Sequence, residues 1–341
     1  MNFTADLSKV SAPSFPRSGD IDVVIPVCNG ARFIRECIES VFAQTLRPRR
    51  IIIVDDGSID GTADIVDELW GSNPSLLLHR MERNLGVSAA RNAGIRLSEA
   101  PFIAFIDADD IWRREKLARQ AEVFEKCQRP VGFVHSSFFL IDETGNPIPH
   151  KDGPPPLLCG NIFLRLLREG NILSGSASSI LIKRGVLDRA GFFDEQLYYG
   201  EDWDLWLRLA AISEAGHTSD AVVGIRIHPK SAQVVRGNGT DRFLQLMMVY
   251  CRWEQCVRED RSSIMRLRRA GFIAFLTSAR SFREVVSFYP ALKTSKQSLV
   301  HDLYGSQLDF WSGLLVTAIA KVIRLIDRSL RRCLRSFGWI N

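Results

Sequence analysis

Short runs of apolar residues alternate with longer amphipathic stretches over the first third of the chain. Four apolar runs predict buried strands, and they span residues 21–27, 51–54, 76–78 and 102–106. Between these runs, apolar residues recur at helical spacing over residues 33–42, 62–70 and 87–97. This alternation predicts an α/β fold with a doubly wound, mostly parallel, Rossmann-like sheet. Ligands on such sheets bind beyond the carboxyl ends of the strands.

The pattern changes further along the chain. Pro154-Pro155-Pro156 predicts a stiff loop or a subdomain boundary. Mixed structure follows, with helices expected over residues 162–168 and 205–211, and from about Asp241 the pattern is almost wholly helical. We therefore expect three parts, which are a flexible leader over residues 1–19, a main domain over 20–240 and a helical C-terminal extension over 241–341.

Composition and charge narrow the class of protein. Hydrophobic residues make up 46% and charged residues 24% of the 341 residues, which excludes a disordered chain and a polytopic membrane protein. Residues 241–341 hold 17 Lys/Arg against 8 Asp/Glu, whereas residues 1–240 are mildly acidic. A nucleic-acid-binding protein would carry its basic stripe on the main domain, so no nucleic acid partner is expected. A basic tail points to a protein partner or an anionic membrane surface.

The seven cysteines give no sign of a disulfide framework or a zinc site. They are odd in number, scattered, and include no Cys-x-x-Cys pair. No basic-then-apolar signal segment opens the chain. Reduced thiols and a cytoplasmic location are the expectation.

The first acidic cluster, Asp107-Ala108-Asp109-Asp110, directly follows an apolar run. Carboxylates at a strand end can converge on Mg²⁺ or Mn²⁺, which prefer oxygen ligands and share them with substrate phosphates. The alternative is a solvated acidic turn with an Asp helix cap. A second cluster, Asp55-Asp56-Gly57-Ser58, ends a neighbouring run and can accept hydrogen bonds from a base or a ribose, or form an ordinary turn.

Three further groups could carry chemistry. Arg91 lies among small residues and could bind a diphosphate or form an ion pair with an acidic cluster. The alternative is a solvated arginine on a helix. Glu201 and Asp202 stand at the start of an apolar amphipathic helix. Asp202 could act as a general base, or both carboxylates could simply stabilise the helix N-terminus. His228, in Arg226-Ile227-His228, could contact a metal or phosphate, or be structural.

Several common motifs are absent. No Gly-x-Gly-x-x-Gly follows the first strand, and no Gly-x-x-x-x-Gly-Lys-Ser/Thr phosphate loop is present. The string Gly175-Ser176-Ala177-Ser178-Ser179 lacks the second glycine of a serine-hydrolase motif. Dinucleotide binding and serine hydrolysis are therefore disfavoured.

Taken together, these strings resemble the family 2 inverting glycosyltransferases of the GT-A fold over about residues 20–235. The resemblance is carried by five motifs in order, which are Val24-Ile25-Pro26-Val27-Cys28-Asn29-Gly30, Ile53-Val54-Asp55-Asp56-Gly57-Ser58, Phe105-Ile106-Asp107-Ala108-Asp109-Asp110, Gly191-Phe192-Phe193-Asp194-Glu195 followed by Glu201-Asp202, and Arg226-x-His228. Cys28 stands where a tyrosine is commoner in that family. The resemblance divides the main domain into a nucleotide half at about 20–115 and an acceptor half at about 116–240.

The resemblance also implies a role for each motif. Asp109 would bind a divalent cation, with His228 near the metal or diphosphate, and Asp202 would be the catalytic base beside Glu201. The implied nucleotide-binding residues are Pro26, Val27, Asn29, Asp55, Asp56, Arg91, Asp107 and Ala108. Asp56 would contact a pyrimidine base and Asp107 would lie near the ribose.

The implied activity is inverting transfer of a sugar from a nucleotide-sugar, with UDP favoured by family habit, in polysaccharide or glycolipid assembly. The acceptor would be a glycan or a lipid-linked sugar. Residues 315–335 predict a basic amphipathic helix, with apolar residues on one face and basic residues on the other. Such a helix could bind peripherally to the inner face of the cytoplasmic membrane, or pack on protein. The alternatives are a nucleotidyltransferase and a non-catalytic protein that binds nucleotide-sugars or glycans.

Overall fold

The computed structural model describes residues 15–149, 158–173 and 176–229, together with residues 245, 248, 249, 252 and 253. Contacts divide the chain into two compact units, Met1–Val235 and Arg236–Asn341, and the fold described here belongs to the first. Most of the predicted leader, the Pro154–Pro156 segment and the basic amphipathic helix lie outside the described residues. Within the described ranges, no helix is both long enough and apolar enough to cross a membrane.

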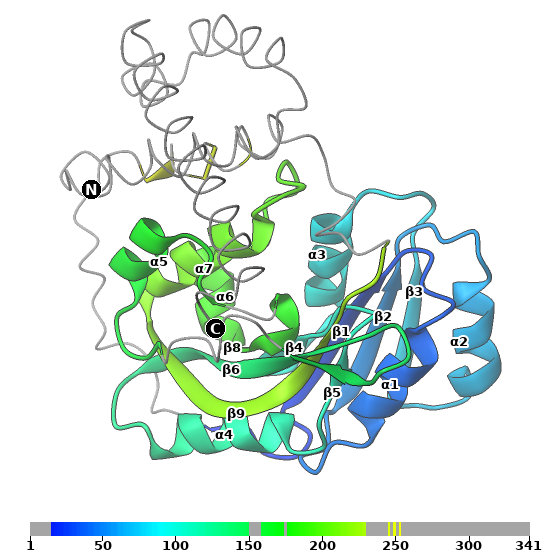
Figure 1. The fold of residues 1–341 in the computed structure, drawn as a ribbon, viewed down its shortest axis with the longest axis horizontal. Coiled ribbons are helices and arrows are strands. Elements are labelled where there is room, and N and C mark those ends of the chain that lie inside the picture. Colours follow the sequence, from blue (N-terminus) through cyan, green and yellow to red (C-terminus); the bar gives the residue numbers. More distant parts are fainter. Residues whose placement is uncertain are drawn as a thin grey trace, which may run out of the picture. The chain divides into compact units, whose positions relative to one another are not determined.

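A buried strand near the start of the chain is the centre of a parallel half-sheet (Figure 1). β1 (Ile21–Val27) is buried at every position and lies between β2 (Arg50–Asp55) and β4 (Phe102–Phe105), parallel to both. β3 (Leu76–Arg80) continues the sheet beyond β2, again in parallel. The predicted apolar runs form these strands because strands of a parallel sheet are covered on both faces.

Helices cover both faces of this half. α1 (Ile34–Phe42) and α2 (Thr62–Trp70) pack in one apolar core on the first face. α3 (Val87–Leu97) packs on the opposite side of β1 and β2, where Gly94 comes against Val24 of β1. The sheet is therefore doubly wound, as its alternating pattern predicts.

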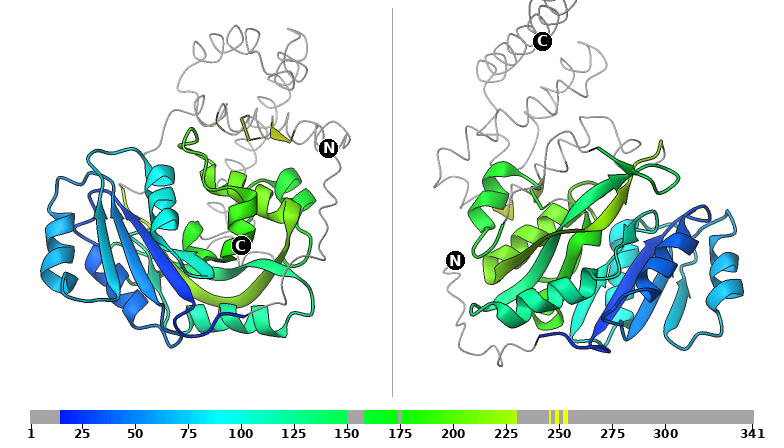
Figure 2. Two further views of the ribbon diagram at one scale, coloured as in Figure 1. Left: turned by 180° about the vertical axis from the view of Figure 1, so that it is seen from behind. Right: turned by 60° about the horizontal axis from the view of Figure 1, so that its bottom comes forward.

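The second half of the sheet is mixed. β8 (Ile180–Lys183) pairs antiparallel with β4, and β6 (Val131–Ile141) follows it, antiparallel to β8. β9 (Glu214–Arg226) runs parallel to β6 and curves strongly along its length (Figure 2). The register between them shifts at three places, and such irregularities bend strands. The short strands β5 (Ile111–Trp112) and β7 (Pro147–Ile148) pair with β9 and β6 respectively.

The remaining helices lie along this mixed half. α4 (Lys116–Lys126) packs on β6 and β9, and its apolar residues join the core under α1. α5 (Phe163–Glu169) and α6 (Arg184–Ala190) both pack on α7 (Glu201–Ile212). A 3₁₀ turn, Ala177–Ser179, leads directly into β8.

The predicted α/β class and doubly wound sheet are confirmed. α7 begins at Glu201, where the acidic pair predicts the start of a helix, although apolar spacing alone places that start one turn later at Leu205. Its first turn carries Glu201, Asp202 and Asp204. Acidic residues are favourable at a helix N-terminus, although they leave no apolar signal there.

Gly94 in α3 is required by close packing on β1. A Cβ at this position would lie 2.3 Å from Cγ1 of Val24, whose side chain is fully buried. Because a packed core gives way only at a cost, we expect Gly94→Ala to lower the free energy of unfolding by about 1–3 kcal/mol. Urea denaturation of the wild type and the variant measures this change.

Gly185 in α6 is a matched control, because a Cβ there would meet no atom within 4 Å. At that position the helix propensity of alanine decides the outcome, so Gly185→Ala is expected to be neutral or to stabilise by up to about 1 kcal/mol. Equal stability of Gly94→Ala and the wild type would contradict the packing argument.

Candidate active site

The loops that follow β1 and β2 are tied to each other. Asn29 donates its backbone N–H to Ser58 Oγ at 2.8 Å, and its Oδ1 accepts from the Ile59 N–H at 2.9 Å. Gly30 donates its N–H to Thr62 Oγ1 at 2.9 Å. Asn29 has φ 54°, in the left-handed region that asparagine tolerates better than most residues. Asn29 thus shapes this loop while remaining exposed at the carboxyl end of β1.

Pro26 and Val27 lie at the end of β1, beside the turn that follows β4. Pro26 has no backbone N–H, and it is tolerated because β1 pairs with β4 only as far as Val24. A Cβ on Gly30 would lie 2.5 Å from Val27 Cγ2 and 3.7 Å from the Cβ of Ala108. Ala108 therefore lies against Gly30, in the loop that follows β1.

The carboxylates of Asp55 and Asp56 are buried and bind backbone N–H groups. Asp55 Oδ1 accepts from the N–H of Ser58 at 2.9 Å. Asp56 accepts from the N–H groups of Leu85 at 2.6 Å and Gly86 at 2.8 Å. These bonds hold the loops after β2 and β3 in place. A carboxylate offers about four acceptor sites, so both groups keep capacity for a ligand.

The acidic turn after β4 is bound from two sides at Asp107. Arg91 Nη2 donates to Asp107 Oδ1 at 2.8 Å, and the backbone N–H of Asp107 donates to Ser178 Oγ at 2.9 Å. The side chain of Arg91 is only 4% exposed. Arg91 is therefore a buried partner of the acidic turn and not a solvated helix residue.

Asp109 and His228 lie together, although 119 residues separate them in the chain. His228 Nε2 lies 3.0 Å from Asp109 Oδ2, and the imidazole packs on the ring of Phe33 with centroids 5.1 Å apart. Burial and the charge of Asp107 raise the pKa of Asp109, and the hydrogen bond to His228 opposes that rise.

The donor atoms of this pair suit a divalent cation, because carboxylate oxygen is the usual ligand of Mg²⁺ and Mn²⁺ and imidazole nitrogen is a common metal ligand. In the structure the two atoms lie 3.0 Å apart and are hydrogen-bonded to each other. Within the described ranges, no group of three His, Cys, Asp or Glu side chains is arranged to hold a metal ion. The other positions would fall to water and substrate phosphates, which is the usual environment of Mg²⁺.

Asp110 is the buried member of the turn. Its Oδ2 accepts from Ser178 Oγ at 2.6 Å, and its Oδ1 accepts from the backbone N–H of Arg226 at 3.1 Å. Burial, followed by the charges of Asp109 and Asp107, raises the pKa of Asp110 well above its ordinary value. Ser178 thus accepts from one end of the turn and donates to the other.

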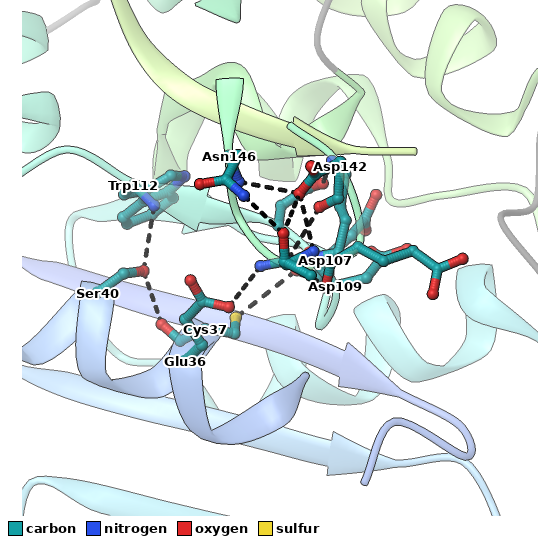
Figure 3. A network of polar contacts seen from close by, with 12 residues as sticks. Glu36, Cys37, Ser40, Asp107, Asp109, Trp112, Asp142 and Asn146 are labelled. Atoms are coloured by element: carbon teal, nitrogen blue, oxygen red, sulfur yellow. Dashed lines mark hydrogen bonds and ion pairs between the residues drawn. The ribbon is translucent and has the colours of Figure 1, made fainter. Parts of the chain in front are cut away.

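Arg226 braces the same turn from the end of β9. Its Nε donates to the carbonyl of Asp109 at 2.7 Å, and its Nη1 donates to the carbonyls of Asp142 and Glu143. Its Nη2 forms an ion pair with Glu36 on α1 at 2.6 Å. Figure 3 shows Glu36 and Asp142 on opposite sides of the turn that holds Asp109. The turn is therefore fixed between α1, β9 and the loop that joins β6 to β7.

The acidic start of α7 meets the acidic turn through Arg91. Arg91 Nη1 lies 3.3 Å from Glu201 Oε1, while Nη2 lies 2.8 Å from Asp107 Oδ1. Burial lowers the pKa of the Arg91 guanidinium, but Asp107 and Glu201 together raise it above its ordinary value. The guanidinium therefore stays charged, and it links the end of β4 to the first turn of α7.

Asp202 is half-buried beside Glu201. Burial and the charge of Glu201 raise the pKa of Asp202 to about 6, whereas the charge of Arg91 lowers it. Its Oδ2 accepts from the side-chain amide of Asn171 at 3.0 Å. A carboxyl group with a pKa near neutral pH is suited to remove a proton from a hydroxyl group.

The structure adds three residues that sequence analysis does not select, which are Glu36, Ser178 and Asn171. Glu36 lies on an amphipathic helix and Asn171 in a polar loop, where each resembles an ordinary solvated residue. Ser178 lies in a string considered only as an incomplete hydrolase motif. Their partners are 190, 68 and 31 residues away respectively, so no local pattern reveals them.

Ser178 offers a test of how the acidic turn is held. Ser178→Ala removes the hydroxyl that joins the Asp107 N–H to the buried Asp110 carboxyl group. We expect the free energy of unfolding to fall by about 1–3 kcal/mol, because buried polar groups lose their partner. Urea denaturation measures the change, with Ser179→Ala as the control. The Ser179 hydroxyl donates at 3.2 Å to the Ser176 carbonyl. A loss no larger than the control's would argue against this role.

Curated proteins resemble this chain at moderate identity. An uncharacterized glycosyltransferase of Rickettsia conorii is 28% identical over 211 residues, which are 61% of this chain and 34% of that protein. This chain therefore matches about a third of the length of that relative. The succinoglycan biosynthesis protein ExoU of Rhizobium meliloti is 29% identical over 246 residues, covering 68% of this chain and 67% of ExoU.

Solved structures share the fold. Residues 1–349 of S. aureus TarS, in complex with UDP-GlcNAc, match with a TM-score of 0.58 and 19% identity, over 86% of this chain and 81% of that one. A mannosyltransferase of Pyrobaculum calidifontis, in complex with GDP-Man and Mn²⁺, matches with a TM-score of 0.54 and 18% identity. That match covers 92% of this chain and 90% of the mannosyltransferase. At these identities the likeness shows the GT-A fold alone.

A family model identifies the domain directly. The model described as glycosyl transferase family 2 matches residues 22–191, which run from β1 to the end of α6. Asp107 and Asp109 lie inside this range, and Asp202 follows it closely. The resemblance drawn from the ordered motifs is confirmed. Through residues 22–191 the chain belongs to glycosyl transferase family 2.

Proposed function

We propose that this chain is an inverting glycosyltransferase that moves a sugar from a nucleotide-sugar, with UDP favoured, to a hydroxyl group of a glycan or lipid-linked acceptor. The observation that carries this proposal is the Arg91 guanidinium, which binds Asp107 after β4 and Glu201 at the start of α7. Asp202 adjoins Glu201, so a candidate base lies close to the candidate metal turn. A single carboxylate base on one side and a leaving diphosphate on the other are what inverting transfer requires.

Known proteins support the donor class and the setting. The structure of TarS contains UDP-GlcNAc, and that of the P. calidifontis mannosyltransferase contains GDP-Man and Mn²⁺. ExoU acts in succinoglycan biosynthesis, which favours cell-surface polysaccharide assembly for this chain as well. In our proposal the nucleotide lies at the carboxyl ends of β1, β2 and β4, with Asp56 near the base and Asp107 near the ribose.

In the proposed reaction, the Asp202 carboxylate accepts the proton of the acceptor hydroxyl while the new C–O bond forms. The bond between the anomeric carbon and the leaving diphosphate breaks on the opposite face, so the configuration inverts. Asp109 and His228 would hold a divalent cation, which when bound neutralises charge on the diphosphate. Arg91 keeps Asp107 and Glu201 at fixed positions, and the charge of Glu201 helps to keep the pKa of Asp202 near neutral.

Asp202→Asn tests the base assignment. We expect the transfer rate to fall by about 10²–10⁴-fold, because general base catalysis contributes an effect of that size. The affinity for UDP is expected to be unchanged. In the wild type, kcat/KM should rise with pH through about 6, since Asp202 must be ionised to accept a proton. Asp188→Asn, at an exposed position on α6, is the control. Equal transfer by Asp202→Asn and the wild type would refute the assignment.

Asp109→Ala tests the metal assignment without any acceptor. We expect calorimetric titration of UDP into the wild type to show tight binding with Mn²⁺ and weak binding with EDTA. Asp109→Ala and His228→Ala should bind weakly in both conditions, because each removes one of the two protein ligands. Asp64→Ala, on the exposed side of α2, should behave as the wild type. Mn²⁺-dependent UDP binding that survives Asp109→Ala would count against the proposed site.

A further inference from the structure

The carboxylate of Asp202 is held by hydrogen bonds at both of its oxygens. Asn171 donates its side-chain N–H to Oδ2 at 3.0 Å, and the backbone N–H of Trp203 donates to Oδ1 at 2.7 Å. Two donors on different oxygens fix the rotation of a carboxylate about its Cβ–Cγ bond. We infer that Asn171 is a positioning residue that orients Asp202 and stabilises its ionised form. This inference rests on the proposed role of Asp202 as the base.

The position of Asn171 is itself determined by the end of α5. Gly170 has φ 85° and donates its N–H to the carbonyl of Leu166 at 3.1 Å, which ends the helix and turns the chain toward α7. The indole N–H of Trp203 donates to the same carbonyl at 3.0 Å. Trp203 directly follows Asp202, and both Leu166 and Trp203 are buried. One carbonyl oxygen therefore ties the loop of Asn171 to the helix of Asp202.

The charges around Asp202 explain why a neutral donor suits this position. Glu201 from its own helix and Arg91 from α3 are the charged groups with the largest effect on its pKa. Arg91 already pairs with Asp107 and Glu201. A second cation at position 171 would hold Asp202 strongly ionised and weaken it as a base. An amide stabilises the carboxylate while leaving its pKa, about 6, close to neutral.

Direct titration of Asp202 tests this inference in the full chain without substrate. The protein is labelled with [¹³C]aspartate, and the Asp202 carboxyl resonance is assigned by its loss in Asp202→Asn. Asn171→Ala removes a donor to the ionised form, so we expect the midpoint to rise by about one pH unit. Asn171→Asp places a second carboxylate there and should raise it further. Asn161→Ala, which removes the acceptor of the Phe163 N–H before α5, should leave the Asp202 midpoint unchanged.

Kinetics supply a second measurement. UDP release from the UDP-sugar that the wild type hydrolyses fastest, with water as the acceptor, gives kcat/KM against pH. For Asn171→Ala we expect the acid limb of the kcat/KM profile to shift to higher pH by the same amount as the titration midpoint of Asp202. Below pH 5 this shift lowers kcat/KM about tenfold. A further, pH-independent fall in kcat would reflect lost orientation, with KM for the donor unchanged. Melting temperatures identify any variant that fails to fold.

The outcomes separate the two proposals. If Asp202→Asn is inactive while Asn171→Ala keeps the wild-type midpoint, acid limb and kcat, the inference about Asn171 is overturned and the base assignment stands. If Asp202→Asn releases UDP as fast as the wild type, the base assignment itself fails. If Asn171→Ala melts early, Asn171→Asp and its larger rise in midpoint provide the decisive comparison.

Discussion

The arrangement of the site depends on one buried guanidinium. Arg91 is 4% exposed and lies between Asp107 and Glu201. A buried charge costs several kcal/mol unless it is paired, so neither carboxylate can move away without leaving Arg91 uncompensated. Its Nε has no hydrogen-bond partner among the described residues, which leaves the two terminal nitrogens to satisfy the group. The spacing of the two acidic segments is therefore set by the width of a single side chain.

The packing of α3 places the Arg91 side chain between the two acidic segments. Small residues let the helix lie close to β1, as the contact between Gly94 and Val24 shows. Asn92, the next residue after Arg91, exchanges hydrogen bonds of 2.9 Å with both the N–H and the carbonyl of Phe193. The guanidinium also lies 5.1 Å from the ring of Phe193. α3 is thus attached through two neighbouring residues to the segment that leads into α7. This attachment fixes the position of that segment, in the second half of the fold, relative to α3 in the first half.

The parts of this architecture that sequence analysis predicts are those that leave a local pattern. Buried parallel strands appear as uninterrupted apolar runs, and the acidic clusters at their ends share one edge because parallel strands end together. Other features depend on atoms that meet over long separations, such as Arg226 with Glu36 and Asn171 with Asp202. The engagement of Asp56 by two backbone N–H groups belongs to the same class. Such contacts follow from the packed fold and not from any short string.

The pairing of β4 with β8 has a consequence for which parts of the molecule can move. The acidic turn follows β4, and α7 packs on β9. The β4–β8 pairing joins these two parts in one continuous hydrogen-bonded sheet. A rotation of one half against the other would break main-chain bonds in the middle of the core, so hinge closure is a costly way to open this site. Any movement that accompanies ligand binding is therefore expected in the loops beyond the strand ends, because such loops can shift on microsecond to millisecond timescales without breaking the sheet.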